Sequence, residues 1–539
     1  MTDRLRRFLP ATLVLLLGMA GFWLVRREAA PLPRSTRQEA LRAPAPEPPP
    51  EATPPAKSTA RDEFADGTTI EIFGSCRPEE LILRFPTDAS YDSFTAVLAG
   101  SSVRLIDRLD RLRAMRVGGS TADMETLARM FEDERLTVYK TLTRLPDPAR
   151  ATGGASRRNA LGFGDQVLAW LGVSGDNSRW GAGVKVAILD SGVVPHPGLP
   201  RNIRSIEIFS SESGTIHPHA TAVASLIAGT NPMAPGLAPA VDLISVRVLD
   251  DSGTSDAYAV AAGILAAMDA GAQILNLSLG EQDDCPLLGD AIRMALDAGV
   301  VVVASSGNEG LQSAKYPAAY PGVIAVGAID ASGERMAFSN LGNGLGLTAP
   351  GYGVNAAAPG GGYISISGTS ASAPLVVAAI AATMSDGSGR RIPATEAAKL
   401  VLANADDEGL PGPDSEYGSG VLNLDRLMNR GVRSRYDAAI TCQRLLPASG
   451  PGLARQVEIT VQNRGTEILI NSLIEITSSA GSTRINATTI APGASGSFTA
   501  TVPANALTGG ISSSVTLGNG IPDRSPDNNF RSGSLPGVF

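Results

Sequence analysis

The chain has 539 residues, enough for several domains, and 43% of them are hydrophobic, so a sizeable core can form. Its formal net charge of −8 argues against nucleic acid as the main partner. The three cysteines, Cys76, Cys285 and Cys442, are widely separated and lack the spacing of zinc ligands, which excludes a disulfide-stapled scaffold and leaves at most one disulfide.

The N-terminus predicts a targeting segment at 1–28. Three arginines among the first seven residues precede an uncharged stretch at 8–25, which as a helix spans about 27 Å, just enough to cross the core of a bilayer. The stretch is long for a signal peptide, which favours an uncleaved anchor. We expect an exported protein that is membrane-anchored facing outside the cytoplasm, or secreted if the segment is cleaved. Residues 29–67, rich in Pro and Ala, predict a linker.

Residues 68–145 predict a small α+β module, because strand and helix patterns alternate there. The expected strands are 80–85, 103–109, 112–117 and 136–142, and the expected helices are 91–98 and 124–131. Residues 146–160 contain Pro, Gly, Ser and Arg without periodicity and predict an exposed connector that is open to cleavage.

Residues 161–432 alternate near-continuous apolar strands with helices, which predicts a mostly parallel, doubly wound α/β sheet with helices on both faces. The expected strands are 184–189, 243–249, 273–277, 300–304 and 323–326. Residues 433–539 change to alternating Thr- and Ser-rich runs with turn signals between them, and they predict a small all-β sandwich.

Four polar side chains stand at the ends or starts of predicted buried elements. Asp190 ends the first strand of the sheet, His219 opens an apolar helix, Asn308 follows a later strand, and Ser370 opens a helix that is apolar on all sides. Each one alone also fits a structural role, as a cap, a surface residue or a turn. The carboxyl ends of parallel strands are where such sheets hold their sites, so the four together favour one catalytic site.

The order of these residues and the sequence motifs around them resemble those of the subtilisin-like serine proteases (subtilases, peptidase family S8). The matching words are Asp190-Ser-Gly-Val-Val-Pro-His196-Pro-Gly-Leu, His219-Ala-Thr-Ala-Val-Ala, Leu277-Ser-Leu-Gly280, Gly307-Asn308-Glu-Gly310 and Gly368-Thr-Ser370 followed by Ala373-Pro374. The resemblance covers residues 163–430. Two small residues, Ala220 and Ala371, replace the glycine and methionine of the family pattern.

The resemblance implies a serine endopeptidase that works through an acyl-enzyme. His219 would be the general base, Asp190 would orient it, and Asn308 would stabilise the oxyanion together with the backbone N–H of Ser370. Of the other two histidines, His196 would be structural, and His217 is expected on the opposite side of the chain from His219.

The resemblance also implies where substrate binds, as a strand added along the edges at 251–255 and 277–280. The expected contacts are Gly253, Leu277, Ser278, Leu279, Gly280, Ser305, Ser306, Gly307, Lys315 and Thr369. Lys315 stands where the family often has a small residue at the floor of the first pocket, so its charge predicts a preference for an acidic residue at the cleavage position. A solvated surface lysine is the alternative.

The module at 68–145 resembles the inhibitory propeptide of the family, which would block the site until it is cut within 144–160. Residues 433–539 resemble the small adhesion-like (CARDB-like) bacterial β-sandwiches and predict a surface ligand. The expected partners are protein or peptide substrates, the chain's own propeptide, and the membrane through an uncleaved anchor, but no nucleic acid. The chemistry requires no cofactor; subtilases often bind calcium, and no loop here defines a site for it.

Two other functions stay open. The chain could be a catalytically silent subtilase relative whose β-sandwich binds a partner at a surface. It could also be an esterase or lipase, against which the Asp, His, Ser order and the lack of a Gly-x-Ser-x-Gly word count.

Overall fold

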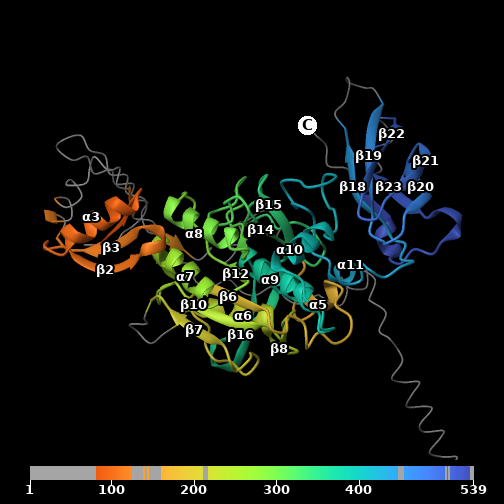
Figure 1. The fold of residues 1–539 in the computed structure, drawn as a ribbon. Coiled ribbons are helices and arrows are strands. Elements are labelled where there is room, and N and C mark those ends of the chain that lie inside the picture. The colour runs from red at the N-terminus through yellow and green to blue at the C-terminus, as the bar shows by residue number, and fades with distance from the viewer. Residues whose placement is uncertain are drawn as a thin grey trace, which may run out of the picture.

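The computed structural model describes residues 80–120, 160–209, 216–446, 454–503, 507 and 510–533, and within 121–144 it describes 122, 123, 126, 137–139 and 142–144. The predicted targeting segment, the linker, the connector up to residue 159 and most of the predicted helix at 124–131 lie outside these residues. Figure 1 shows three regions in a row: an α+β module, a central α/β domain and a β-sandwich. No helix among the described residues is long and apolar enough to cross a membrane.

The N-terminal module is a four-stranded antiparallel sheet with the strand order β2-β3-β1-β4, covered on one face by a helix. Its elements are β1 (Glu80–Arg84), α3 (Asp88–Leu98), β2 (Arg104–Leu109), η1 (Asp110–Leu112), β3 (Ala114–Gly118) and β4 (Thr137–Tyr139). Helix α3 begins earlier than predicted because Thr87 caps it, accepting the N–H of Ser90 at 3.1 Å. Strand β3 begins later than predicted because a 3₁₀ turn precedes it.

The last predicted strand of the module, 136–142, is wrong as a single element. The structure has β4 and then a second short strand, β5 (Leu142–Arg144), which leaves the module sheet. Strand β5 pairs antiparallel with β11 (Thr254–Asp256) of the central domain. This pairing connects two segments that are more than a hundred residues apart, which no local pattern reveals.

The predicted doubly wound sheet is confirmed in the central domain as seven strands in the order β15-β14-β13-β12-β6-β10-β7, each pair parallel. Their bounds are β6 (Lys185–Asp190), β7 (Arg204–Glu207), β10 (Asp242–Arg247), β12 (Ile274–Leu277), β13 (Val301–Ser305), β14 (Ile324–Ile329) and β15 (Leu345–Pro350). All five predicted strands are present; β7 and β15 were not predicted. Short antiparallel pairs flank the sheet: β8 (Thr230–Asn231) with β9 (Ala234–Pro235), and β16 (Val354–Ala358) with β17 (Gly362–Ile366), joined by η4 (Pro359–Gly361).

Helices cover both faces of this sheet because side chains along each strand alternate between two cores. In β6, Val186 and Ile188 join the core under one set of helices, while Ala187 and Leu189 join the core under the other. The first set is α5 (Val167–Trp170), α6 (His219–Ala228), α9 (Thr369–Met384), α10 (Ala394–Ala403) and α11 (Leu424–Met428), and the second is α7 (Ala257–Asp269) and α8 (Pro286–Asp297).

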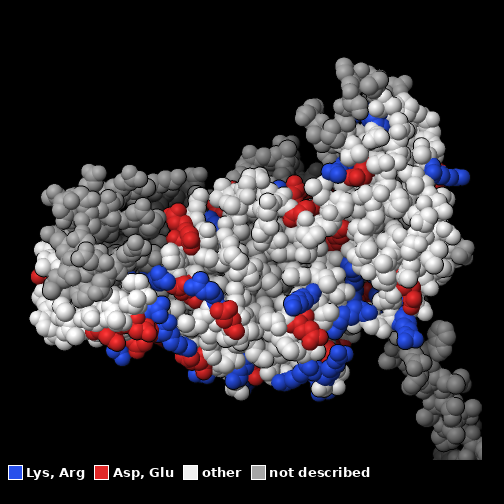
Figure 2. Space-filling model, turned by 45° about the horizontal axis from the view of Figure 1, so that its top comes forward, with Lys and Arg blue, Asp and Glu red and all other residues white. Residues whose placement is uncertain are grey.

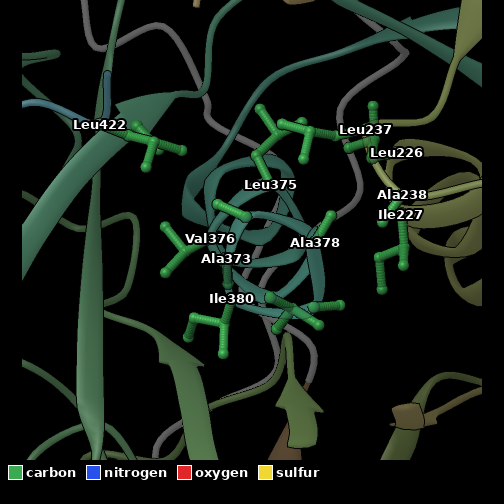
Figure 3. Close-up of a cluster of buried hydrophobic side chains, with 14 of the residues drawn as sticks. Leu226, Ile227, Leu237, Ala238, Ala373, Leu375, Val376, Ala378, Ile380 and Leu422 are labelled. Carbon is green, nitrogen blue, oxygen red and sulfur yellow. The ribbon is translucent and has the colours of Figure 1, made fainter. Parts of the chain in front are cut away.

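Helix α9 runs through the middle of the first core, and every one of its residues is buried. Figure 3 shows its side chains meeting neighbours on several sides, with Leu375 and Ala378 facing α6 and Val376 lying on the side of Leu422. The prediction of a helix that is apolar all round, and therefore buried, is confirmed.

The C-terminal residues form two antiparallel sheets around their own core, which confirms the predicted all-β region. One sheet has the order β18-β19-β22 and the other β21-β20-β23-β24. The bounds are β18 (Ala438–Leu445), β19 (Arg455–Asn463), β20 (Leu469–Ser478), β21 (Gly481–Ile490), β22 (Ser495–Val502), β23 (Ile511–Thr516), η6 (Gly518–Gly520), η7 (Pro526–Asn529) and β24 (Phe530–Gly533).

Candidate active site

A buried carboxylate and an imidazole form the centre of the site. Asp190 is the last residue of β6 and is fully buried, and His219 is the first residue of α6. Nδ1 of His219 lies 2.8 Å from Oδ2 of Asp190, and the other carboxylate oxygen accepts the N–H of Ser191 at 2.6 Å. When Nδ1–H donates to the carboxylate, Nε2 of the neutral ring is left as a proton acceptor. The imidazole is one-fifth exposed, so this nitrogen can reach a bound molecule.

The second histidine lies near the first, which corrects the expectation that it faces the opposite side. The ring centroids of His217 and His219 are 6.4 Å apart, and Nδ1 of His217 accepts the N–H of His219 at 3.4 Å. Opposite sides follow only from an extended chain, whereas Pro218 between them has a helical backbone, with φ −70° and ψ −11°. Burial lowers the pKa of His217 and the neighbouring His219 lowers it further, while the charge of Asp190 acts in the opposite direction.

The third histidine is structural, as the resemblance implied. His196 is buried, and its Nδ1 accepts the N–H of Gly198 at 2.9 Å. With Nδ1 as acceptor, Nε2 carries the proton and donates to the carbonyl of Gly362 at 3.0 Å. Both ring nitrogens are therefore used to fasten the loop after β6 onto the β16–β17 hairpin.

The candidate nucleophile lies at the start of the buried helix. Ser370 is the second residue of α9 and is 7% exposed. Its Oγ donates to the carbonyl of Ser278 at 3.4 Å, and Oγ of Ser278 donates back to the carbonyl of Ser370 at 3.2 Å. The turn before it needs glycine, because Gly368 has φ 142° and a Cβ there would lie 3.1 Å from Nδ2 of Asn308. Free backbone N–H groups and the helix dipole favour negative charge at this point.

The side-chain amide of Asn308 is oriented by the residue next to the serine. Its Oδ1 accepts the N–H of Thr369 at 2.9 Å and the hydroxyl of Thr369 at 3.0 Å. With the oxygen held in this way, the NH₂ group lies on the side of Gly368.

Thr369 differs from the prediction that it contacts substrate. Its side chain is fully buried, and its hydroxyl also accepts the N–H of Gly307 at 3.2 Å. It therefore holds the turn of Asn308 against α9 and acts as a positioning residue. The side chains of Leu277 and Leu279 also differ, because both lie in the core under α7 and α8, so they can meet a substrate only through their main chain.

The predicted pocket residues 305–307 lie beside Asn308, with their polar groups directed into the fold. Ser305 and Ser306 are fully buried, and Oγ of Ser306 donates to the carbonyl of Asn340 at 3.1 Å. Gly307 has φ 110°, and its carbonyl accepts the N–H of Asn340 at 3.1 Å. These residues form the buried segment that leads into Asn308 and fixes its position.

Sequence reasoning missed Asn340, which organises this turn from a distance. Its Oδ1 accepts the N–H groups of Glu309 at 3.0 Å and Leu311 at 2.9 Å, and its Nδ2 donates to Glu309 at 3.0 Å. Asn340 stands in a loop without a motif, so only the folded chain brings it to the turn.

Lys315 lies beside the edge at 277–280, and its side chain is 17% exposed and paired, which differs from a freely solvated surface lysine. A Cβ on Gly280 would lie 3.2 Å from Cβ of Lys315, so the lysine stem packs against this edge. Its Nζ lies 2.7 Å from Oε1 of Glu309, and Oε2 of Glu309 accepts the N–H of Asn308 at 3.0 Å. The lysine charge is thus matched by a carboxylate that also holds the turn of Asn308.

The other expected edge is already occupied by the chain itself. Gly253 lies in a tight turn with φ 76°, closed by its N–H to the carbonyl of Asp250 at 3.0 Å. Strand β11 follows at once and pairs with β5, so that Thr254 lies opposite Arg144 and Asp256 opposite Leu142. Among the described residues, no group of three or more His, Cys, Asp or Glu side chains is arranged to hold a metal ion.

Sequence comparisons with known proteins point to one family. Residues 181–420 match the model of the subtilase family. The chain is 37% identical over 252 residues to Subtilisin Savinase of Lederbergia lenta, covering 46% of this chain and 90% of that protein. It is 34% identical over 284 residues to the thermostable alkaline protease of Halalkalibacterium halodurans, covering 50% of this chain and 76% of that protein. The solved structure of the prenylagaramide maturation protease PagA is similar at 29% sequence identity with a TM-score of 0.42, and the match covers 47% of this chain and 95% of that chain.

Proposed function

Because the chain belongs to the subtilase family and is a serine endopeptidase, we propose that Ser370, His219 and Asp190 carry its reaction, with Asn308 as oxyanion donor. The observation that carries this assignment is the 2.8 Å contact between a fully buried Asp190 carboxylate and Nδ1 of His219. A buried carboxylate in that position fixes the tautomer in which Nε2 accepts a proton.

The reaction begins when Nε2 of His219 takes the proton of Ser370 and Oγ attacks the peptide carbonyl carbon. The oxygen of the tetrahedral intermediate accepts hydrogen bonds from Nδ2 of Asn308 and the backbone N–H of Ser370. His219 then gives its proton to the leaving amine as the C–N bond breaks, which leaves an ester on Ser370. A water molecule, deprotonated by His219, hydrolyses this acyl-enzyme and restores the serine. Asp190 stays ionised throughout and stabilises the imidazolium.

Protein and peptide substrates bind as an added strand at the main chain of β11 and of residues 277–280. The pairing of β11 with β5 supports this assignment, because it demonstrates that an extended chain fits antiparallel along that edge. The tight turn at Gly253 leads directly into this edge and sets its direction.

The module at 68–145 is the chain's own inhibitor, so that the enzyme is made as a zymogen. Support comes from β5, which continues from the module and fills the β11 edge where substrate binds. The N-terminal segment at 1–28 directs export, and the sandwich at 433–539 is an accessory domain that binds a surface ligand.

Processing is expected within residues 144–160. N-terminal sequencing of the active material should start in this range, because the connector lies after β5 has passed the substrate edge. Active material that begins before residue 140 would contradict the zymogen assignment, since the inhibitory strand would still be attached. The Ser370→Ala chain is the matched control and should remain uncut if the protein processes itself.

A covalent probe tests the assignment of the nucleophile. A fluorophosphonate should label the processed protein at Ser370, identified by mass spectrometry of the labelled peptide, and Ser370→Ala should not be labelled. A well-folded protein that takes up no label would support the catalytically silent alternative.

The ion pair between Lys315 and Glu309 sets the charge preference of the first pocket. Glu309→Gln keeps an acceptor for the N–H of Asn308 but leaves the lysine charge without its partner. We expect the ratio of kcat/KM for a substrate with Glu at the cleavage position over one with Phe to rise about tenfold. The measurement uses two fluorogenic peptides that differ only at this residue.

Adding Lys315→Met to Glu309→Gln should return the ratio to its starting value. If Glu309→Gln leaves the ratio unchanged, Lys315 does not face the substrate, and its predicted role in specificity is wrong.

A further inference from the structure

The inhibitory module docks on the protease domain through the open face of its sheet. Ile82 and Ala114 point from this face into the core under α7 and α8, whereas Leu83 and Met115, their neighbours in the chain, point to helix α3 of the module. This face is apolar at Ile82, Leu112 and Ala114, where it meets the protease, as the buried centre of an interface usually is. Figure 2 shows basic and acidic side chains side by side along this border on the face in view.

An arginine stands in the middle of this docking face. Arg116 lies on the central strand β3, two residues after Ala114 and opposite Ile82 of β1. It is only 9% exposed. A guanidinium so deeply buried costs free energy unless it is paired, so its surroundings on the protease must supply a partner.

The protease supplies two groups that together fit a guanidinium. One nitrogen of Arg116 donates to a carboxylate oxygen of Asp256, and the guanidinium carbon lies 4.8 Å from the ring centroid of Tyr258. A carboxylate in the plane and an aromatic face above it are the two features that recognise arginine rather than lysine. The carboxylate side chain keeps 18% of its surface exposed and the arginine 10%, so water screens this pair weakly.

The carboxylate of this site is held in place by the protease domain itself. Asp256 is the N-cap of α7, and the same carboxylate oxygen accepts the N–H of Ala259 at 2.8 Å. Asp256 also ends β11, the edge that β5 covers. One residue therefore connects the body of the module to the strand that fills the substrate edge.

We propose that Asp256 and Tyr258 form a guanidinium-binding site on the protease and that Arg116 occupies it as the anchor that holds the inhibitory module in place. This inference rests on the proposed function of the module. In two further ion pairs, Arg84 with Asp290 and Arg111 with Asp269, an arginine of the module again meets an aspartate of the protease domain. Arg111 and Asp269 are well exposed, so that pair contributes little.

The rate at which the cleaved module dissociates tests the anchor. Processed full-length protein is diluted into a fluorogenic peptide, and the first-order appearance of activity is followed, each variant being normalised to its own final rate. Arg116→Met should speed dissociation at least about thirty-fold, because it leaves Asp256 without its buried partner. Arg108→Met is the matched control, since Arg108 pairs with Asp110 at the exposed surface of the module, and it should change the rate less than twofold.

Asp256→Asn keeps a helix cap and a native module, so it tests the site if Arg116→Met fails to fold. It should also speed dissociation, and in the double variant the two effects should not add. Equal dissociation rates for Arg116→Met, Asp256→Asn and Arg108→Met would overturn the proposal.

A second measurement does not depend on activity. In the uncut Ser370→Ala chain, amide hydrogen exchange at β11 reports undocking of β5. Arg116→Met should raise exchange there, and Arg108→Met should not. If the protein takes up no serine probe, the proposed function fails, while this exchange still decides whether Arg116 anchors the module.

Discussion

Replacing Ser370 with alanine is expected to lower kcat by about 10⁶-fold, the scale known for the nucleophile of subtilisin. Without Oγ no acyl-enzyme forms, and a water molecule must attack a carbonyl that only Asn308 and backbone N–H groups polarise. KM should change little, because Oγ of Ser370 donates to the carbonyl of Ser278 and contributes little to ground-state binding. Steady-state kinetics on a peptide substrate measures both constants, provided that the variant is first cut within 144–160 by an added protease and then freed of the module, of that protease and of wild-type protein.

A second variant separates the contribution of the oxyanion donor from that of the nucleophile. Asn308→Leu removes the oxyanion donor but keeps the nucleophile, and it should lower kcat by about 10²–10³-fold, again the scale known for subtilisin. If both variants lose the same small amount, Ser370 is not the nucleophile. A wild-type level of activity in Ser370→Ala would overturn the assignment outright.

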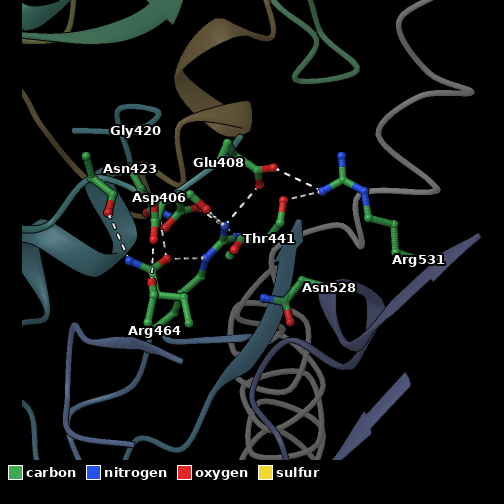
Figure 4. A network of polar contacts seen from close by, with 12 residues as sticks. Asp406, Glu408, Gly420, Asn423, Thr441, Arg464, Asn528 and Arg531 are labelled. Atoms are coloured by element: carbon green, nitrogen blue, oxygen red, sulfur yellow. Dashed lines mark hydrogen bonds and ion pairs between the residues drawn. The ribbon is translucent and has the colours of Figure 1, made fainter. Parts of the chain in front are cut away.

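Replacing Arg464 with methionine is expected to lower the free energy of unfolding by about 3–5 kcal/mol. The arginine stands in the turn after β19 and is almost completely buried between the sandwich and the protease domain. It lies 3.1 Å from Asp406 and 3.0 Å from Glu408. Figure 4 draws the network that these residues form. Its removal takes this ion pair away from the buried carboxylate of Asp406, to which the amide of Asn423 still donates at 2.9 Å.

The measurement is thermal and denaturant unfolding of the processed protein, followed by a probe in each domain because the domains need not unfold together. Arg484→Met is the matched control, since Arg484 pairs with Glu475 across an exposed hairpin, and it should change stability by less than about 0.5 kcal/mol. Equal losses for the two variants would contradict a special role of the buried arginine.

Further contacts at the same junction fasten the sandwich to the protease domain. Oε1 of Gln462 accepts the backbone N–H of Asp407 at 3.0 Å and the side-chain Nε–H of Arg464 at 3.0 Å, so it holds a backbone group of one domain and the arginine of the other. Arg531 adds a contact to Glu408 from the last strand. We expect proteolysis to release the sandwich more readily in Arg464→Met than in the wild type, which the same samples can show on a gel.

The sequence by itself determined the elements whose patterns are local. The sequence indicates two kinds of feature: buried elements, such as the strands at 184–189 and 300–304 and the helix after Ser370, and the order of the four polar residues Asp190, His219, Asn308 and Ser370. Both can be recognised because the spacing of apolar residues along an element, and a polar residue at its end, involve only residues close together in the chain. The motifs around these four residues also indicate the subtilase family, which the family model matches at residues 181–420.

Only the tertiary structure decided contacts between segments far apart in the chain. Asn340 forms hydrogen bonds to the turn of Asn308, Lys315 pairs with Glu309, and Arg116 pairs with Asp256. None of these side chains belongs to a sequence motif or a periodic pattern that would indicate its partner. A buried charge must have a partner, but which partner it has depends on how sheets and helices pack, and a one-dimensional pattern does not contain that packing.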